Sequence, residues 1–338
     1  MLKKYYSDNL TGRVYDAYFS IDGAVRAYRD DCTLYGVTAD EATLAINAFF
    51  FDNPDVYFCC AQFVTMEGSS QGVRLRFSYH QCDEGKFARE LKKITDELDK
   101  KITSQTTDYD VAKAAYDVLA ATVKGDSEVL CAYGRLNVRD RVQVEEFSQT
   151  HGTSFCAYGA IVEKKAVCMG VSLAYKLLLD KYRVECAVVT GDYNGIPHMM
   201  NVVEADGKRA YVDVTKGFMD EQLPMVRYDV FMMGEKKVRK YFAPQQDFGC
   251  VDEDLHYFAK NGFWFKDGYA LRRYLNSFTY EKTGGEVRFY YTGKGFDDRA
   301  LGKLAGDILP RRCGTEFDYV GCIVEHGVGN AILKKHKE

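Results

Sequence analysis

A cysteine at the start of a predicted helix is the first candidate for chemistry in this sequence. Cys168 opens a run of helical period over residues 168–179, after a segment that contains glycine and alanine. In the first turn of a helix, backbone N–H groups lack intrahelical partners and the helix dipole favours negative charge. We therefore expect Cys168 to ionise readily to the thiolate, which is the nucleophilic form of cysteine.

Two short β-prone runs after this helix place a histidine and an aspartate on one face of a hairpin. Residues 198–204 and 209–215 are joined by a turn with an Asp-Gly pair, the strongest short hairpin signal. The register that this turn fixes makes His198 and Asp213 diagonal neighbours, with Cα atoms roughly 7–8 Å apart. An imidazole–carboxylate hydrogen bond is then within reach, whereas a slip by one residue would send the two side chains to opposite faces.

Cys168, His198 and Asp213 together supply a nucleophile, a base and an acid that orients the base. A cysteine taken at random is more often a buried structural thiol, and a single histidine on an apolar strand is more often a core residue. His198 departs from that interpretation because Asp213 falls on the same face, and the role of Asp213 depends in turn on His198. We predict a catalytic triad in the chain order Cys, His, Asp.

The stretch of residues 158–217 resembles the transglutaminase-like superfamily, in particular its bacterial branch. Members read Tyr-Gly-Ala, Ala-Val-Cys-x-Gly-x-x-x-Ala, His-x-x-Asn-x-Val, Asp-Gly and Val-Asp-Val-Thr in this order. The matching residues here are Tyr158-Gly159-Ala160, Ala166-Val167-Cys168-Met169-Gly170 with Ala174, His198-Met199-Met200-Asn201-Val202-Val203, Asp206-Gly207 and Val212-Asp213-Val214-Thr215. The family usually has Trp where Met200 stands and often Trp-Asp where Lys216-Gly217 stand, so the resemblance does not predict the shape of a substrate groove.

This resemblance implies a papain-like α+β core in which the nucleophile helix packs on an antiparallel sheet that carries His198 and Asp213. It also implies thiol-dependent acyl transfer on a peptide or protein amide, with Cys168 attacking the carbonyl, His198 moving the proton and Asp213 holding the imidazole. We favour water as the acceptor, as in a cysteine peptidase or amidase, because the sequence indicates no calcium site of the kind that regulated transglutaminases use. The alternatives are transglutaminase-type crosslinking, an arylamine acetyltransferase that depends on acetyl-CoA, and a non-catalytic peptide- or glycan-binding module.

The oxyanion of such a reaction needs hydrogen-bond donors. We expect the backbone N–H of Cys168 to be one of them, because donors at a helix start point at an adjacent carbonyl oxygen. Members of the family often add an upstream side chain, for which Tyr158 is our candidate. Asn201 lies on the strand face opposite His198, so we expect it to make a structural hydrogen bond.

Composition excludes several classes of protein. The net charge of −4 arises from 45 basic and 49 acidic residues, with no basic tract that would indicate nucleic-acid binding. No apolar run approaches the roughly 18 residues that span a membrane. The eleven cysteines follow no metal-ligand or disulfide spacing, so we expect reduced thiols, no metal, no cofactor and a cytoplasmic protein. A secreted or cell-surface protein is the alternative if an upstream signal peptide was removed; the oligomeric state is not predicted.

We predict three regions: an N-terminal α+β region at residues 1–105, the catalytic core at 106–217, and a C-terminal extension at 218–338 with a small α/β unit. Residues 15–28 fit either a helix or a strand pair. Residues 124–157 read as a loop with a short irregular element, a candidate for a lid that would bring His151 toward the cleft. The other predicted helices are 38–51, 84–102, 106–123, 253–260, 268–278 and 297–309, and the other predicted strands are 57–66, 72–80, 184–190, 286–292, 319–325 and 331–335.

Overall fold

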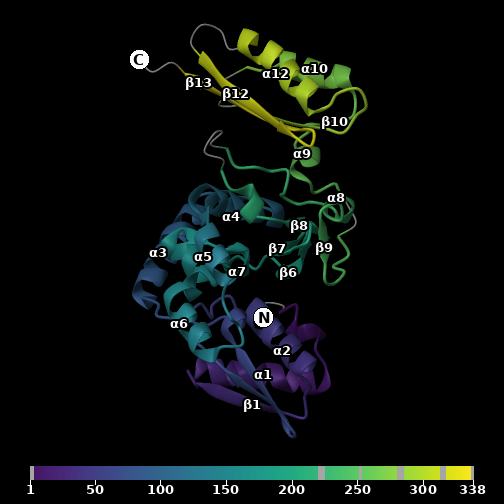
Figure 1. Ribbon diagram of the computed structural model, residues 1–338. Helices are drawn as coiled ribbons and strands as arrows, with labels where there is room; N and C mark the ends of the chain where they lie inside the picture. Colours follow the sequence, from purple (N-terminus) through teal and green to yellow (C-terminus); the bar gives the residue numbers. More distant parts are fainter. Residues whose placement is uncertain (1–3, 220–224, 251–252, 280–284, 313–316, 336–338) are drawn as a thin grey trace.

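The computed structural model describes residues 4–219, 225–250, 253–279, 285–312 and 317–335 of the 338-residue chain. Helices and strands are mixed along these residues, which confirms the α+β class. Three units follow one another from the bottom to the top of Figure 1, and we call them the N-terminal unit (residues 10–80), the central unit (81–263) and the C-terminal unit (264–335). Among the described residues, no helix combines the length and the apolar character needed to cross a bilayer.

The N-terminal unit packs two helices against a three-stranded sheet of order β1-β3-β2. The predicted helix at 38–51 is confirmed, and it begins with a capping box: the Thr38 side chain accepts the N–H of Glu41 while the Glu41 carboxylate accepts the N–H of Thr38. Residues 15–28 lie mostly in the helix α1. The strand predicted at 57–66 is largely wrong, because residues 61–63 form a 3₁₀ turn and the strand β2 begins only at Thr65. The elements are α1 (Gly12–Arg26), β1 (Asp31–Tyr35), α2 (Ala39–Asp52), β2 (Thr65–Ser69) and β3 (Gly72–Arg76).

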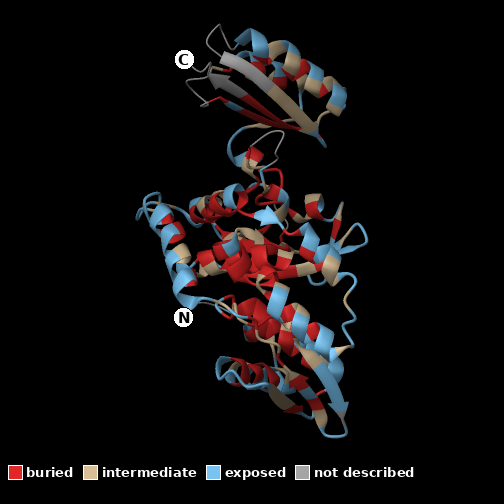
Figure 2. Ribbon diagram, turned by 60° about the vertical axis from the view of Figure 1, so that its left-hand side comes forward, coloured by how far each residue is buried: buried red, intermediate tan, exposed pale blue. Residues whose placement is uncertain are grey.

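The central unit is built on an antiparallel sheet of order β8-β7-β6-β9, with one buried helix, α7, packed on it. The strands are β6 (Cys186–Tyr193), β7 (Ile196–Ala205), β8 (Lys208–Val212) and β9 (Phe242–Pro244). Around α7 (Cys168–Lys181) lie α3 (Glu84–Asp99) and α4 (Asp108–Thr122), which begin near their predicted first residues. Buried residues, red in Figure 2, gather in this unit.

One hydrophobic cluster holds the central unit together and reaches beyond it. Leu98 of α3, Leu119 of α4 and Leu178 of α7 are fully buried in this cluster, and Phe63 of the N-terminal unit is buried in it as well. Burying a side chain of this size stabilises the fold by about 1.5–3 kcal/mol. The same cluster therefore lies on both sides of the boundary that we predict between residues 105 and 106.

Residues 124–157 are not the loop that we predict. They form β4 (Lys124–Gly125), which pairs with β5 (Lys165–Ala166), and then α5 (Ser127–Tyr133) and α6 (Arg141–His151), followed by a 3₁₀ turn. Both helices have an aspartate N-cap: Asp126 accepts the N–H of Val129, and Asp140 accepts two backbone N–H groups of α6. Phe147 of α6 packs on Phe63, so this segment is part of the packed body.

The C-terminal unit is a four-stranded sheet of order β10-β11-β13-β12, with two helices packed against each other and one of them packed on the sheet. It has its own hydrophobic cluster and is tied to the central unit by polar contacts, among them the Arg227–Glu325 ion pair at 3.0 Å and a hydrogen bond from Arg288 to the carbonyl oxygen of Val226. Its elements, most of them predicted, are β10 (Trp264–Phe265), α10 (Gly268–Asn276), β11 (Glu286–Tyr291), α12 (Asp298–Arg312), β12 (Phe317–Glu325) and β13 (Val328–Lys335); the short helices α8 (Glu235–Val238) and α9 (Tyr257–Lys260) precede it at the end of the central unit.

Candidate active site

Cys168 is the first residue of α7, and a close contact with the preceding segment fixes this helix start. The N–H of Val167, the extended N-cap residue, donates to the carbonyl oxygen of Ser154 at 3.1 Å. A Cβ atom on Gly170 would overlap the carbonyl oxygens of Ser154 and Cys156, so only glycine allows the helix to approach so closely. The predicted helix start is confirmed, and Cys168 is partly exposed there.

The hairpin of β7 and β8 has the register that the sequence predicts. Asn201 pairs with Val212, and both residues of the Asp-Gly tip have positive φ, 53° and 71°, as a type I′ turn requires. Nε2 of His198 lies 2.8 Å from Oδ2 of Asp213. The exposed fraction of the His198 side chain is 10% and that of Asp213 is 1%, so the pair is largely shielded from water.

Asp213 is held both through its carboxylate and through its backbone. Its Oδ1 atom accepts the N–H of Lys216 at 3.0 Å, while its own N–H donates to the carbonyl oxygen of Val230 at 3.0 Å. The turn after this residue is tightly packed, because a Cβ on Gly217 would overlap the Tyr116 ring. A buried carboxylate is stable only with such donors, and here they also fix the direction of the oxygen that faces His198.

The imidazole of His198 is hydrogen-bonded to Asp213, and the Cys168 side chain acts on the same ring by raising its pKa. Because Nε2 faces Asp213, Nδ1 is the ring nitrogen left for the sulfur of Cys168. Burial, the largest effect, lowers the pKa of His198, but the charge and hydrogen bond of Asp213, together with Cys168, raise this pKa to about 10. The ring therefore carries its second proton at neutral pH, and a neighbouring imidazolium favours the thiolate form of cysteine.

Two aromatic rings and a lysine that the sequence analysis missed surround the imidazole. The rings of Tyr193 and Phe242 lie edge-on to His198, with centroid distances of 5.6 Å and 6.3 Å, and the Lys216 ammonium lies 4.4 Å from the Tyr193 centroid. The Asn-Gly pair at residues 194–195 could have predicted the position of Tyr193. A two-residue turn there sets Gly191 opposite His198, which puts Tyr193 on the face of the imidazole. No local pattern pointed to Phe242 in the distant strand β9.

Tyr158, the candidate oxyanion donor, and Asn201, the candidate structural residue, make different contacts. The Tyr158 hydroxyl accepts the N–H of Asp83 at 3.2 Å, and its ring stacks on Phe87 of α3 with centroids 5.9 Å apart. Its assignment to the oxyanion stays a prediction. Asn201 is completely buried and donates from Nδ2 to the carbonyl oxygen of Ser172 at 3.0 Å, which ties β7 to α7 as a structural residue would.

The backbone N–H of Cys168 has no hydrogen-bond partner within the described part of the chain. This donor sits at the first position of α7, beside the sulfur, where an oxyanion would form. His151, the residue that we predict to approach the cleft, instead packs on Phe147 within α6. In the ranges that the structure describes, no group of three or more His, Cys, Asp and Glu side chains has an arrangement that would hold a metal ion.

No protein-family model and no curated protein matches this chain. Among solved structures, a crystal structure of a TGase is similar to it, with a TM-score of 0.33 and 16% sequence identity. The match covers 47% of this chain and 44% of that one, so the chain spans less than half the length of that structure. A function for this chain therefore has to be inferred from the geometry of Cys168, His198 and Asp213.

Proposed function

We propose that the chain catalyses thiol-dependent acyl transfer on peptide or protein amides, with water as the acceptor. The observation that carries this proposal is the position of the His198 ring, which is hydrogen-bonded to the Asp213 carboxylate at 2.8 Å and whose pKa is also raised by the Cys168 side chain. A nucleophile, a base within reach of it and a third group that orients the base are the parts that such chemistry needs.

In the proposed reaction, the proton of the Cys168 thiol resides on Nδ1 of His198, and the thiolate attacks the carbonyl carbon of the amide. The oxyanion that forms accepts a hydrogen bond from the backbone N–H of Cys168. The imidazolium then gives its proton to the nitrogen of the leaving amine, the C–N bond breaks and an acyl-thioester remains on Cys168. Asp213 holds the ring orientation and the charge of the imidazolium throughout.

Release of the acyl group repeats these steps with a new nucleophile. His198 removes a proton from water, the hydroxide oxygen attacks the thioester carbonyl and the thiolate leaves, which regenerates the enzyme. A primary amine in place of water would give an amide product, which is the crosslinking reaction. The acceptor therefore decides between a peptidase or amidase and a transglutaminase.

An activated ester tests the proposal without knowledge of the natural substrate. With p-nitrophenyl acetate, we expect a rapid burst of p-nitrophenolate and an acetyl group on Cys168, located by mass spectrometry. The burst should vanish in Cys168→Ala and persist in Cys131→Ser, because Cys131 is, among the cysteines that the structure describes, the exposed thiol open to nonspecific acylation. Decay of the acetyl-enzyme that is independent of added primary amine supports hydrolysis, and decay accelerated by the amine, with amide product, supports transfer. If Cys168 is acylated no faster than Cys131, the result contradicts the enzyme and supports a non-catalytic binding module.

A further inference from the structure

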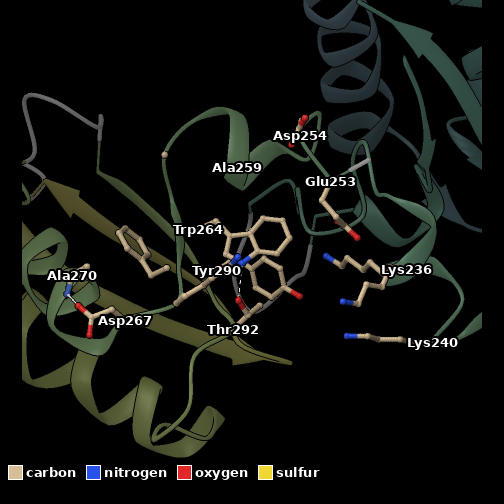
Figure 3. A pocket seen from close by; sticks show the side chains of 14 residues that line it. Lys236, Lys240, Glu253, Asp254, Ala259, Trp264, Asp267, Ala270, Tyr290 and Thr292 are labelled. Atoms are coloured by element: carbon tan, nitrogen blue, oxygen red, sulfur yellow. Dashed lines mark hydrogen bonds between the residues drawn. The ribbon is translucent and has the colours of Figure 1, made fainter. Parts of the chain in front are cut away.

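Two neighbouring cavities lie where the central unit meets the C-terminal unit. The larger one, of about 750 Å³, extends from α8 to β10 and is drawn in Figure 3. The second, of about 590 Å³, extends from the turn before β7 to β12 and β13. Lys237, Lys240 and Tyr290 line both, so the two cavities adjoin, and we call them together the junction groove.

An aromatic pair forms the centre of the larger cavity. The rings of Trp264 and Tyr290 lie with centroids 4.7 Å apart, and Nε1 of Trp264 donates to Oγ1 of Thr292 at 2.8 Å, which fixes the indole in place. Figure 3 shows the ammonium groups of Lys236 and Lys240 directed toward this pair. A ligand here would meet a flat apolar surface with positive charge beside it.

The lysines of this cavity outweigh the acids that are free to neutralise them. Lys236, Lys240 and Lys266 have no acidic partner among the residues that the structure describes. Of the acids, Asp254 is paired with the Lys208 ammonium at 2.8 Å, and Asp267 accepts the N–H of Ala270 as the N-cap of α10. The Glu253 and Asp267 carboxylates remain against the lysines Lys236, Lys237, Lys240 and Lys266, so the cavity favours an anionic ligand.

The buried end of the groove is held rigidly. The Lys237 ammonium donates to the carbonyl oxygen of Asp229, lies 3.0 Å from Nε2 of His256 and sits 4.7 Å from the Tyr290 centroid. Lys237 thus fixes α8, from which Lys236 projects, against the C-terminal unit. The basic side of the groove keeps its position relative to the aromatic pair because both are attached to this contact.

An open sheet edge in the same cavity favours a peptide as the ligand. β10 is an edge strand, and its pairing with β11 uses the carbonyl oxygens of Phe263 and Phe265. Backbone groups alternate in direction along a strand, so those of Trp264 and Lys266 face away from β11, and they have no partner within the described residues. An extended peptide can pair with such an edge, whereas a glycan offers no matching backbone.

We propose that the junction groove binds an extended, acidic peptide segment, with its backbone along β10, its carboxylates at Lys236, Lys240 and Lys266, and an apolar side chain on Trp264 and Tyr290. If the proposed function holds, this segment belongs to the substrate. The second cavity leads toward the candidate triad, because Tyr193 and Lys216 line it, and the Tyr193 ring is 5.6 Å from that of His198. The groove would then select proteins with acidic stretches near the reacting amide.

The chain's only tryptophan, Trp264, reports binding directly through its fluorescence. A glutamate-rich peptide should change the Trp264 emission saturably, and glutamine-rich and lysine-rich peptides of equal length should bind about tenfold more weakly or not at all. The double variant Lys236→Gln/Lys240→Gln should weaken glutamate-peptide binding about tenfold. The matched control, Lys92→Gln/Lys93→Gln on the exposed face of α3, should bind as the native chain does.

Several results would overturn the proposal: no emission change, equal binding of the glutamine-rich peptide, or undiminished binding by the Lys236/Lys240 variant. Binding of polygalacturonate, an anionic glycan, without binding of the glutamate-rich peptide would also overturn it. Cys168→Ala separates this inference from the proposed function, because its groove is intact. If Cys168→Ala binds the peptide but Cys168 of the native chain is unreactive, the proposed function is refuted and the peptide groove is supported. If Cys168 is reactive but no peptide binds, the proposed function is supported and the peptide groove is refuted.

Discussion

The buried carboxylate of Asp213 lies 2.8 Å from Nε2 of His198 and gives its other oxygen to the N–H of Lys216. These two hydrogen bonds fix the orientation of the carboxylate. The carboxylate in turn holds the imidazole in one orientation, which leaves Nδ1 for Cys168. The reactivity of Cys168 should therefore depend on a residue that never contacts a substrate.

Asp213→Asn should slow alkylation of Cys168 by iodoacetamide about tenfold or more near pH 7. Without the Asp213 charge, burial lowers the pKa of His198, so the imidazolium that favours the thiolate is lost. The deficit should shrink at alkaline pH, where solvent removes the thiol proton. Asp206→Asn on the same hairpin is the matched control, since its φ of 53° suits asparagine. Equal rates for both variants across pH would contradict the prediction.

The protonated imidazole should also stabilise the fold over a defined range of pH. The pKa of His198 is about 10 in the folded chain against 6.5 for an ordinary histidine, so the folded state binds the proton more tightly. The stability from this proton is complete below pH 6.5 and is lost as pH rises through about 10, on the order of a few kcal/mol. Urea denaturation of the native chain and of His198→Gln should give a difference in unfolding free energy that narrows between these values. A difference that stays constant with pH would refute this.

Gly170→Ala should damage both stability and the thiol site. The new Cβ would overlap the carbonyl oxygens of Ser154 and Cys156, and the first turn of α7 would have to move away from them. We expect a loss of roughly 1–3 kcal/mol in unfolding free energy and slower acylation of Cys168. Gly23→Ala, in the exposed middle of α1 with open space around it, should instead stabilise by roughly 0.5–1 kcal/mol. Both are measured by denaturation and by the p-nitrophenyl acetate burst.

The variant Tyr158→Phe tests whether the Tyr158 hydroxyl acts on the oxyanion, as the sequence suggests, or only makes the structural contact seen in the fold. The hydroxyl accepts the N–H of Asp83 at the start of α3, so its removal should cost about 0.5–1.5 kcal/mol of stability. The burst rate should stay within about twofold, because the backbone N–H of Cys168 is the donor beside the sulfur. A fall of a hundredfold or more, of the size that loss of an oxyanion donor causes, would restore Tyr158 to that role.

The site could be predicted from the sequence where local rules fix geometry. The Asp206-Gly207 turn permits one hairpin register, and this register brings His198 and Asp213 to one face. The first turn of α7 was readable because small residues precede an apolar helical run. Local patterns of this kind also predict the starts of α2 and α4, where the structure shows capping boxes.

The rest depends on contacts between distant segments. Phe242 reaches the imidazole only because β9 adds to the edge of the sheet beside β6, and the junction groove depends on contacts between the two units such as Arg227 with Glu325, Arg288 with Val226 and Lys237 with Tyr290. The loop predicted at residues 124–157 was wrong although the sequence contains a local signal for helices there, since Asp126 and Asp140 are both good helix N-caps.

The hydrophobic cluster that α3 shares with α4 and α7 sets the limits for truncation. A recombinant fragment that starts at residue 106 would keep all three candidate catalytic side chains but strip Leu98 and Ile94 from the packed interior. The apolar faces so uncovered would favour aggregation over a foldable enzyme. Anyone seeking a minimal version of this protein should retain α3 and the aromatic residues Phe51 and Phe63, which belong to the same hydrophobic cluster.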